Sequence, residues 1–318
     1  MPELRVDPLS GLRTIIAPDR SERPIELVEP RWDTPGTDPF ATGNESQTPP
    51  ELYALTSTDG AWRVRVFENL YPALDAEPGE PVAEAKPDLY TRLPASGAHE
   101  VIVNSSRAVA SLSELTVEEL GAAVEVWRLR MRAHPDAACL HLSVNEGHGG
   151  GASIAHTHAQ LYALDFVPAL IARERERSGA YATRSMGGSL LGDLVQEEVR
   201  GRERIVAIDD EAVLLAPFAS WLPYQMLLAP RRPRPRFEDE GPAGVGLLHD
   251  ALSRLARLLG GSPPLNLWVR TAPRGAEHFC WRIDILPRLG GLAGLELGTG
   301  VHLNSVAPER AASELRGA

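Results

Sequence analysis

Short apolar runs with alternating or β-branched residues predict strands, and apolar residues repeating at helical spacing predict helices between them. The clearest helix is expected at residues 116–134, because Thr116 and Glu119 form a capping box ahead of an apolar stripe that includes Trp127. Strands are expected at residues 14–17, 62–66, 97–103, 140–144, 225–230, 265–271 and 279–286. Further helices are expected at 168–177, 242–259 and 308–316, and a glycine-punctuated strand and loop at 293–304.

The second half of the chain repeats the order of elements in the first half at an almost constant distance along the sequence. The matching element starts are Glu100 and Gln225 for a strand, Thr116 and Pro242 for a helix, and Leu140 and Leu265 for the next strand. A repeated order at one offset is typical of an internal duplication. We therefore predict two related halves, residues 1–175 and 176–318.

A glycine-rich turn between two predicted strands carries the residues with the most chemistry. The second strand is expected to open with His156, His158 and Gln160, which point the same way because strand side chains alternate between faces. Two imidazoles and an amide beside glycines that let backbone N–H groups approach an anion favour phosphate chemistry. Singly, the histidines could be half of a metal site and the glycines only a turn. Together they favour catalysis.

The stretch Asn145-x-Gly147, a small-residue loop ending at Ser153, and His156-x-His158-x-Gln160 resemble the galactose-1-phosphate uridylyltransferase branch of the histidine-triad superfamily. The resemblance covers nearly the whole chain. It implies an α+β fold of two fused histidine-triad-like halves, each an antiparallel sheet with a helix. It also implies that His158 attacks the α-phosphorus of a nucleotide sugar, that Gln160 donates to the phosphoryl oxygens, and that the backbone carbonyl of His156 fixes the tautomer of His158. A glutamine is neither acid nor base, so the pattern favours transfer over hydrolysis.

Further substrate contacts follow from the same resemblance. Arg20 and Arg23 match an Arg-x-x-Arg-Pro motif whose arginines lie near the phosphates, and Asn69 is the candidate for a base or ribose contact. Asn145 is expected to orient the loop or to contact phosphate. The side chain of Ser153 and the loop N–H groups are expected to hold phosphoryl oxygens; these loop residues are Gly149, Gly150, Gly151 and Ala152.

The family's metal ligands are mostly absent from this sequence. At the first metal site of the family, Asp38, Ala41 and Ala108 stand where ligands are expected, and only His156 remains. At the second site Glu174 remains, while Arg282 and Asp284 stand where two histidines are expected. A single imidazole does not hold zinc. We therefore predict no metal and no other cofactor, with an Asp38–arginine or an Arg282–Glu174 ion pair in place of the metal cross-links.

Composition limits the class of protein and its partners. The chain has 318 residues, 43% of them hydrophobic and 24% charged, which is typical of a soluble globular protein. A formal charge of −11 argues against a nucleic-acid partner, and no apolar run reaches membrane-span length. Cys139 and Cys280 stand far apart, which indicates neither a disulfide framework nor a cysteine zinc site. The cytoplasm is the expected location.

The leading functional hypothesis is a nucleotidyltransferase that moves UMP from a UDP-hexose to a hexose 1-phosphate through a covalent uridylyl-histidine at His158. The partners are then a small-molecule nucleotide sugar and a sugar phosphate. A homodimer is considered, because in some family members the C-terminal region reaches the sugar site of a neighbouring subunit. In the second half, Asp284 takes the place of His158, which predicts one active site per chain.

Two alternatives stay open. The first is a nucleotide-sugar or dinucleoside polyphosphate phosphorylase, which uses the same histidine chemistry with inorganic phosphate as acceptor; the sequence at 293–300 slightly favours it. The second is a non-catalytic nucleotide-sugar-binding paralogue. The presence of both His158 and Gln160 argues against it.

Overall fold

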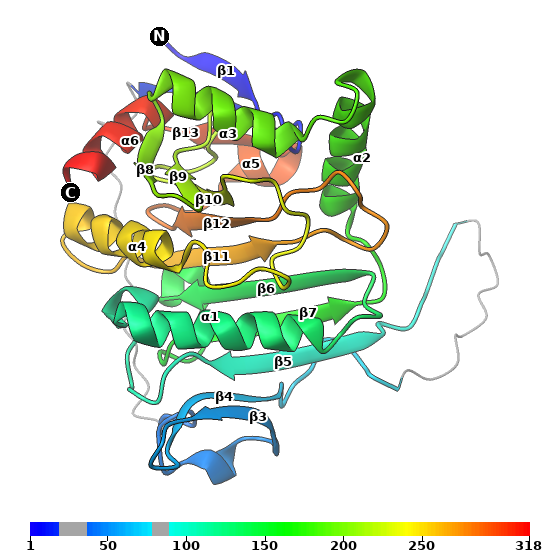
Figure 1. The fold of residues 1–318 in the computed structure, drawn as a ribbon, viewed down its shortest axis with the longest axis vertical. Coiled ribbons are helices and arrows are strands. Elements are labelled where there is room, and N and C mark those ends of the chain that lie inside the picture. Colours follow the sequence, from blue (N-terminus) through cyan, green and yellow to red (C-terminus); the bar gives the residue numbers. More distant parts are fainter. Residues whose placement is uncertain (19–36, 78–88) are drawn as a thin grey trace.

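A ten-stranded sheet, antiparallel between every pair of neighbours, runs through the molecule in the order β3-β4-β5-β7-β6-β11-β12-β10-β9-β8 (Figure 1). The structure is a computed structural model that describes residues 1–18, 37–77 and 89–318. The strands of this sheet are β3 (Glu51–Thr56), β4 (Trp62–Glu68), β5 (Gly97–Val103), β6 (Cys139–Glu146), β7 (His158–Leu164), β8 (Ile205–Ile208), β9 (Ala212–Leu215), β10 (Met226–Pro230), β11 (Leu265–Arg270) and β12 (Arg282–Pro287).

A second, three-stranded sheet joins the two ends of the described chain. It consists of β1 (Glu3–Val6), β2 (Arg13–Ile16) and β13 (Val301–Asn304), and β13 pairs with β2 in parallel. The helices are α1 (Val117–Arg132), α2 (Ala169–Arg184), α3 (Leu190–Gly201), α4 (Val245–Leu259), α5 (Gly294–Thr299) and α6 (Pro308–Gly317). Short 3₁₀ turns are η2 (Glu45–Gln47), η3 (Leu112–Glu114) and η4 (His148–Gly150). Among the described residues, none of the helices has the length and apolar character needed to cross a membrane.

The two halves of the large sheet have the same strand connectivity, counted from the outer edge of each half toward the centre. Starting from either edge, two outer strands are followed by β5, β7 and β6 in one half and by β10, β12 and β11 in the other. The halves meet where β6 pairs with β11, with Asn145 opposite Asn266. The α+β fold with two antiparallel halves is thereby confirmed. The domain boundary proposed after residue 175 falls within the continuous helix α2.

Helices α1 and α4 lie on one face of the sheet, in front of it in Figure 1. The capping box predicted at Thr116 and Glu119 is present at the start of α1. Buried side chains of α1, such as Trp127, share one apolar core with Ile102 of β5 and Leu161 of β7. Because side chains alternate along a strand, Val103 and its partner His158 then face the opposite side of the sheet. The helix-covered face is the core, and the other face carries the site.

Several predicted elements have different bounds in the structure; helix α2, for example, continues to Arg184 beyond the predicted end at residue 177. Residues 294–299 form helix α5 instead of a strand and loop, because Glu296 accepts a hydrogen bond from the Ala293 N–H at the start and Gly300 ends the helix in the left-handed conformation. Strand β12 begins at Arg282 instead of residue 279, and β7 begins at His158 instead of His156. His156 therefore lies in the turn before the strand.

Candidate active site

His158 stands at the start of β7 with one ring nitrogen engaged. Its Nδ1 lies 2.8 Å from the backbone oxygen of His156, and because a carbonyl only accepts, Nδ1 carries the proton. Burial lowers the pKa of His158, which keeps the ring neutral, although the bond to His156 acts in the opposite direction. The described residues give no hydrogen bond to Nε2. This is the geometry of a nitrogen nucleophile, and the predicted tautomer contact is present.

His156 has an acceptor on each side of its ring. Nε2 lies 2.8 Å from the backbone oxygen of Ser105, and Nδ1 lies 2.8 Å from a carboxylate oxygen of Asp38. Both ring nitrogens are therefore engaged with acceptors, which leaves neither as a nucleophile. Among the described residues the charged partner of Asp38 is His156 and no arginine pairs with it. The Asp38–arginine pair stays a prediction, since Arg20, Arg23 and Arg31 lie outside the described residues. Phe40 packs edge-on against both histidines, with ring centroids 6.3 Å from His156 and 5.2 Å from His158.

Gln160 lies two residues along β7 from His158 and is half-buried. Its Oε1 lies 2.9 Å from Nε2 of His99, and it accepts a hydrogen bond of 2.8 Å from the hydroxyl of Tyr162. Asn69, the predicted nucleoside contact, is close by, with Nδ2 at 3.1 Å from His99. The structure thus brings Asn69 near the Gln160 amide through His99.

The glycine-rich turn packs against the second half of the chain. A Cβ atom on Gly150 would lie 2.5 Å from the backbone oxygen of Leu265, and one on Gly149 would lie 3.1 Å from Cβ of Pro264. Backbone N–H groups of Gly150, Gly151 and Ala152 donate to carbonyls within the turn. These three N–H groups are used within the turn. Their binding of phosphoryl oxygens stays a prediction and would require them to exchange these partners for the ligand.

The remaining predicted contacts are placed as follows. Ser153 is exposed, and the buried Ala152 precedes it. Arg20 and Arg23 lie outside the described residues.

Asn145 is joined to a residue that sequence analysis missed. The side-chain nitrogen Nδ2 of Asn266 donates a hydrogen bond of 2.7 Å to Oδ1 of Asn145. It also lies 2.7 Å from the backbone oxygen of Gly150, to which it donates. Arg288 in turn donates to Oδ1 of Asn266 at 2.9 Å. Asn145 is thus linked to the loop through Asn266, which supports the first of its two predicted roles. A polar Asn266 between two apolar strand residues was the available signal.

A second missed group lies behind the histidines. Glu146 is buried and accepts hydrogen bonds from the Ser111 hydroxyl at 2.7 Å and the Leu112 N–H at 2.6 Å. The hydroxyl of Thr157, the residue between the two histidines, donates to it at 3.3 Å. Asn104 donates to the same Thr157 hydroxyl at 3.2 Å. This network fixes the backbone that carries His156 and His158 from the core side of the sheet.

A buried charge cluster joins Glu174 of helix α2 to the second half, at residues where the resemblance implies a second metal site. Two nitrogens of Arg282 each lie 3.1 Å from an oxygen of Glu174, which confirms the predicted ion pair. Arg270 approaches Glu174 to 3.4 Å, and Arg282 also pairs with Asp284 at 3.0 Å. Burial acts to raise the pKa of Glu174, but the two guanidiniums outweigh it and hold the pKa below its usual value. A guanidinium at this place does not fit a metal site, and neither do Asp38, Ala41 and Ala108 with a lone histidine at the first.

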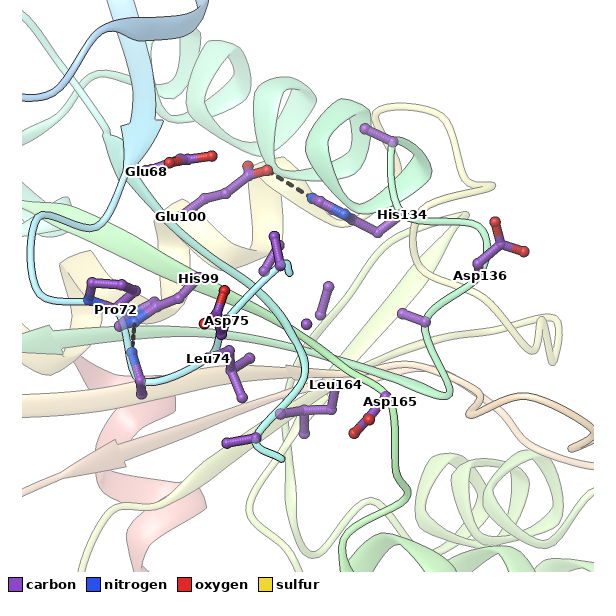
Figure 2. Close-up of a pocket in the computed structure, with 18 of the residues that line it drawn as sticks. Glu68, Pro72, Leu74, Asp75, His99, Glu100, His134, Asp136, Leu164 and Asp165 are labelled. Atoms are coloured by element: carbon purple, nitrogen blue, oxygen red, sulfur yellow. Dashed lines mark hydrogen bonds and ion pairs between the residues drawn. The ribbon is translucent and has the colours of Figure 1, made fainter. Parts of the chain in front are cut away.

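A cavity of about 1030 Å³ opens at the end of β5 that lies away from the glycine-rich turn (Figure 2). His99 is part of its wall, together with carboxylates that include Asp75 and Asp165. Glu100, also in the wall, is neutralised by Arg130 at 2.7 Å and bonded to His134 at 2.7 Å. His158 and Gln160 are not among its lining residues, although Ala163 and Leu164 at the far end of β7 are. His99, whose Nε2 lies 2.9 Å from Oε1 of Gln160, connects the cavity wall to the motif.

Comparison with known proteins gives a consistent family. The chain is 27% identical over 331 residues to an ADP-glucose phosphorylase from Arabidopsis thaliana, covering 99% of this chain and 92% of that protein. It is 25% identical over 333 residues to a galactose-1-phosphate uridylyltransferase from Thermotoga maritima, covering 99% and 98%. A crystal structure of the Arabidopsis thaliana ADP-glucose phosphorylase with bound ADP-glucose matches with a TM-score of 0.84 and 27% identity, covering 100% of this chain and 99% of that chain.

The family model described as galactose-1-phosphate uridyl transferase, N-terminal domain, matches residues 1–168, more than half of the chain. This range contains His156, His158 and Gln160. The chain belongs to the galactose-1-phosphate uridyl transferase family.

Proposed function

We propose that this chain is a nucleotidyltransferase that moves the nucleoside monophosphate of a nucleotide sugar to an acceptor phosphate through His158. In the first step the lone pair of His158 Nε2 forms a bond to the α-phosphorus, and the bond from that phosphorus to the sugar phosphate breaks. A sugar 1-phosphate leaves as an anion. In the second step an acceptor oxygen displaces His158, and Nδ1 keeps its proton throughout.

The observation that carries the proposal is the bond of 2.8 Å between Nδ1 of His158 and the His156 carbonyl, with no hydrogen bond to Nε2 from the described residues. A ring held in this tautomer presents its other nitrogen as a nucleophile at neutral pH. Gln160 supplies an amide donor for the charge that develops on the phosphoryl oxygens. Because an amide does not activate water, the covalent intermediate persists until an acceptor arrives.

Inorganic phosphate is the acceptor that we propose, which makes the reaction a nucleotide-sugar phosphorolysis. The similarity to the Arabidopsis thaliana ADP-glucose phosphorylase, which covers nearly all of both chains with a TM-score of 0.84, supports this choice. The second candidate is transfer of UMP to a hexose 1-phosphate. The family model over residues 1–168 and the Thermotoga maritima relative favour it.

One labelling experiment tests the mechanism and separates the two acceptors. Protein is mixed with ADP-glucose or UDP-glucose labelled with ³²P at the α-phosphate, and an acid-labile, base-stable adduct is expected on His158. Adding phosphate should release labelled ADP or UDP. Release of labelled UDP-galactose with galactose 1-phosphate, and no release with phosphate, would instead support the second candidate.

The matched variants are His158→Ala and His278→Ala, the latter in an exposed loop. The first should lose the adduct and about three orders of magnitude or more in turnover, as expected for a nucleophile, and the second should lose neither. Turnover that persists in His158→Ala would rule out this residue as the nucleophile. Binding of nucleotide sugar without any adduct in the wild type would favour a non-catalytic paralogue.

A further inference from the structure

We propose that His99 and Tyr162 are positioning residues that decide which end of the Gln160 amide faces the phosphoryl group. The inference rests on the proposed function, in which Gln160 donates to phosphoryl oxygens. An amide has an accepting end and a donating end of similar size, and the two ends have opposite effects on an anion. Rotated by half a turn, Gln160 would present its oxygen to the substrate and repel it.

The oxygen of Gln160 is held by two donors. The Tyr162 hydroxyl donates to Oε1 at 2.8 Å, and His99 Nε2 lies 2.9 Å from the same atom. A carbonyl oxygen has two lone pairs, so two donors use its accepting capacity. The amide nitrogen makes no hydrogen bond to the described residues, which leaves both of its N–H groups for a ligand.

The tautomer of His99 is itself set by the backbone. The N–H of Ala73 lies 3.1 Å from Nδ1 of His99, and because a backbone N–H only donates, Nδ1 is the acceptor. The proton is therefore on Nε2, which donates to Gln160. Burial lowers the pKa of His99 despite the bond to Gln160, which keeps the ring neutral. The Asn69 amide nitrogen, 3.1 Å from Nε2, meets an N–H in this tautomer and does not help to hold the ring.

Packing holds the two positioning residues together. His99 on β5 and Tyr162 on β7 are direct partners in the strand register, and their rings stack with centroids 4.1 Å apart. Figure 2 shows His99 in the cavity wall, next to the loop that contains Pro72 and Leu74. The chain of contacts runs from this loop through Ala73 and His99 to Gln160. It couples the segment after Asn69 to the orientation of the catalytic amide.

A double-mutant cycle distinguishes positioning from general structural support. Tyr162→Phe removes the hydroxyl and keeps the ring, and we expect it to slow formation of the His158 adduct about tenfold. In a Gln160→Ala background the same change should cost almost nothing, because no amide remains to orient. Tyr181→Phe, which removes a hydroxyl bonded to Asp193 at 2.7 Å far from the site, is the control and should leave the rate unchanged.

His99 is tested by loss and rescue. His99→Leu should slow adduct formation by a similar factor, and His99→Gln should recover most of the rate, because its side-chain amide can donate to Gln160. Equal effects of Tyr162→Phe with and without Gln160 would overturn the proposal while leaving the nucleotidyl transfer in place.

A readout without substrate keeps the two proposals separable. The side-chain ¹⁵N–¹H₂ signals of Gln160, identified by their loss in Gln160→Ala, should shift in Tyr162→Phe and in His99→Leu, and not in Tyr181→Phe. Unshifted signals would overturn the positioning role even if the enzyme is active. If the signals shift in the two variants while the wild-type protein forms no adduct, the result would support the orientation of Gln160 and reject the proposed function.

Discussion

At the scale of single residues, the two histidines of the motif differ only in what surrounds their rings. His158 meets one carbonyl and keeps its second nitrogen unbonded among the described residues, whereas His156 meets a carbonyl and the Asp38 carboxylate. The first environment leaves one ring nitrogen for nucleophilic attack, and the second engages both nitrogens and holds the ring in place. Asp38 thus performs with a hydrogen bond what a metal does in a ligand set: it fixes the ring and the turn that precedes β7.

The buried carboxyl of Glu146 makes the free energy of unfolding depend on pH. Burial raises the pKa of this carboxyl to about 7, against hydrogen bonds from Ser111, Leu112 and Thr157 that act in the other direction. The folded protein therefore binds the proton more tightly than the unfolded chain. The stability from this group is full below the unfolded pKa near 4.5 and is lost as the pH rises through about 7.

We expect Glu146→Gln to remove this dependence. The wild type should lose about 3 kcal/mol of unfolding free energy between pH 4.5 and pH 7.5, since each pKa unit corresponds to about 1.4 kcal/mol, and the variant should lose much less. Urea unfolding at several pH values measures the difference. Glu203→Gln, at an exposed carboxylate, is the control and should keep the wild-type slope. The same slope in Glu146→Gln would mean that Glu146 is ionised in the folded protein.

At the scale of elements, the glycine-rich turn packs tightly against Pro264 and Leu265 of the second half. Its glycines are needed where the turn meets Pro264 and Leu265, and its internal hydrogen bonds use N–H groups that a phosphate site would have used. The turn therefore sets the position of Asn145 and of β7.

The sequence predicted well those elements whose start and buried face are encoded within one short segment of the chain. The capping box at Thr116 and the apolar stripe of the following helix are complete within one segment, and both are present. The start of β7 was predicted two residues too early, because His156 continues the alternation although its ring is held by Asp38 and Ser105 outside the sheet. Asn266 and Glu146 act through contacts between distant segments, which spacing along the chain does not reveal.

The variant Gly150→Ala tests whether the turn is packed tightly against β11. Its Cβ would lie 2.5 Å from the Leu265 oxygen, a backbone atom that cannot move without shifting β11. We expect a loss of about 1–3 kcal/mol in unfolding free energy, the usual cost of overpacking, and slower adduct formation at His158. Gly246→Ala, in α4 with open space around its Cβ, should be neutral or stabilise by about 0.5–1 kcal/mol. Guanidinium unfolding measures the stability of both variants and of the wild type. A Gly150→Ala variant as stable as the wild type would show that the turn is free to move away from β11.

At the scale of the whole molecule, a continuous sheet joins the half that carries His158, the proposed nucleophile, to a half that has Asp284 at the corresponding position. The strand pairing of β6 with β11 makes the halves one unit, and Asn266 and Arg288 of the second half support the turn of the first. The second half therefore contributes to the site although Asp284 replaces the imidazole. Helix α2 bridges the halves and brings Glu174 to Arg282, so that a charge cluster ties the connecting helix to β12.

The cluster is balanced, with Glu174 and Asp284 opposite Arg270 and Arg282, all buried. Arg282→Met leaves one excess buried carboxylate and should cost about 3–5 kcal/mol, the range measured when one partner of a buried pair is removed. Glu174→Leu should cost a similar amount. The double variant keeps Arg270 and Asp284 as a neutral pair, so we expect it to recover most of the loss. Guanidinium unfolding of the four proteins measures the coupling. Additive losses would mean that packing of the two side chains, not charge balance, holds α2 against the sheet.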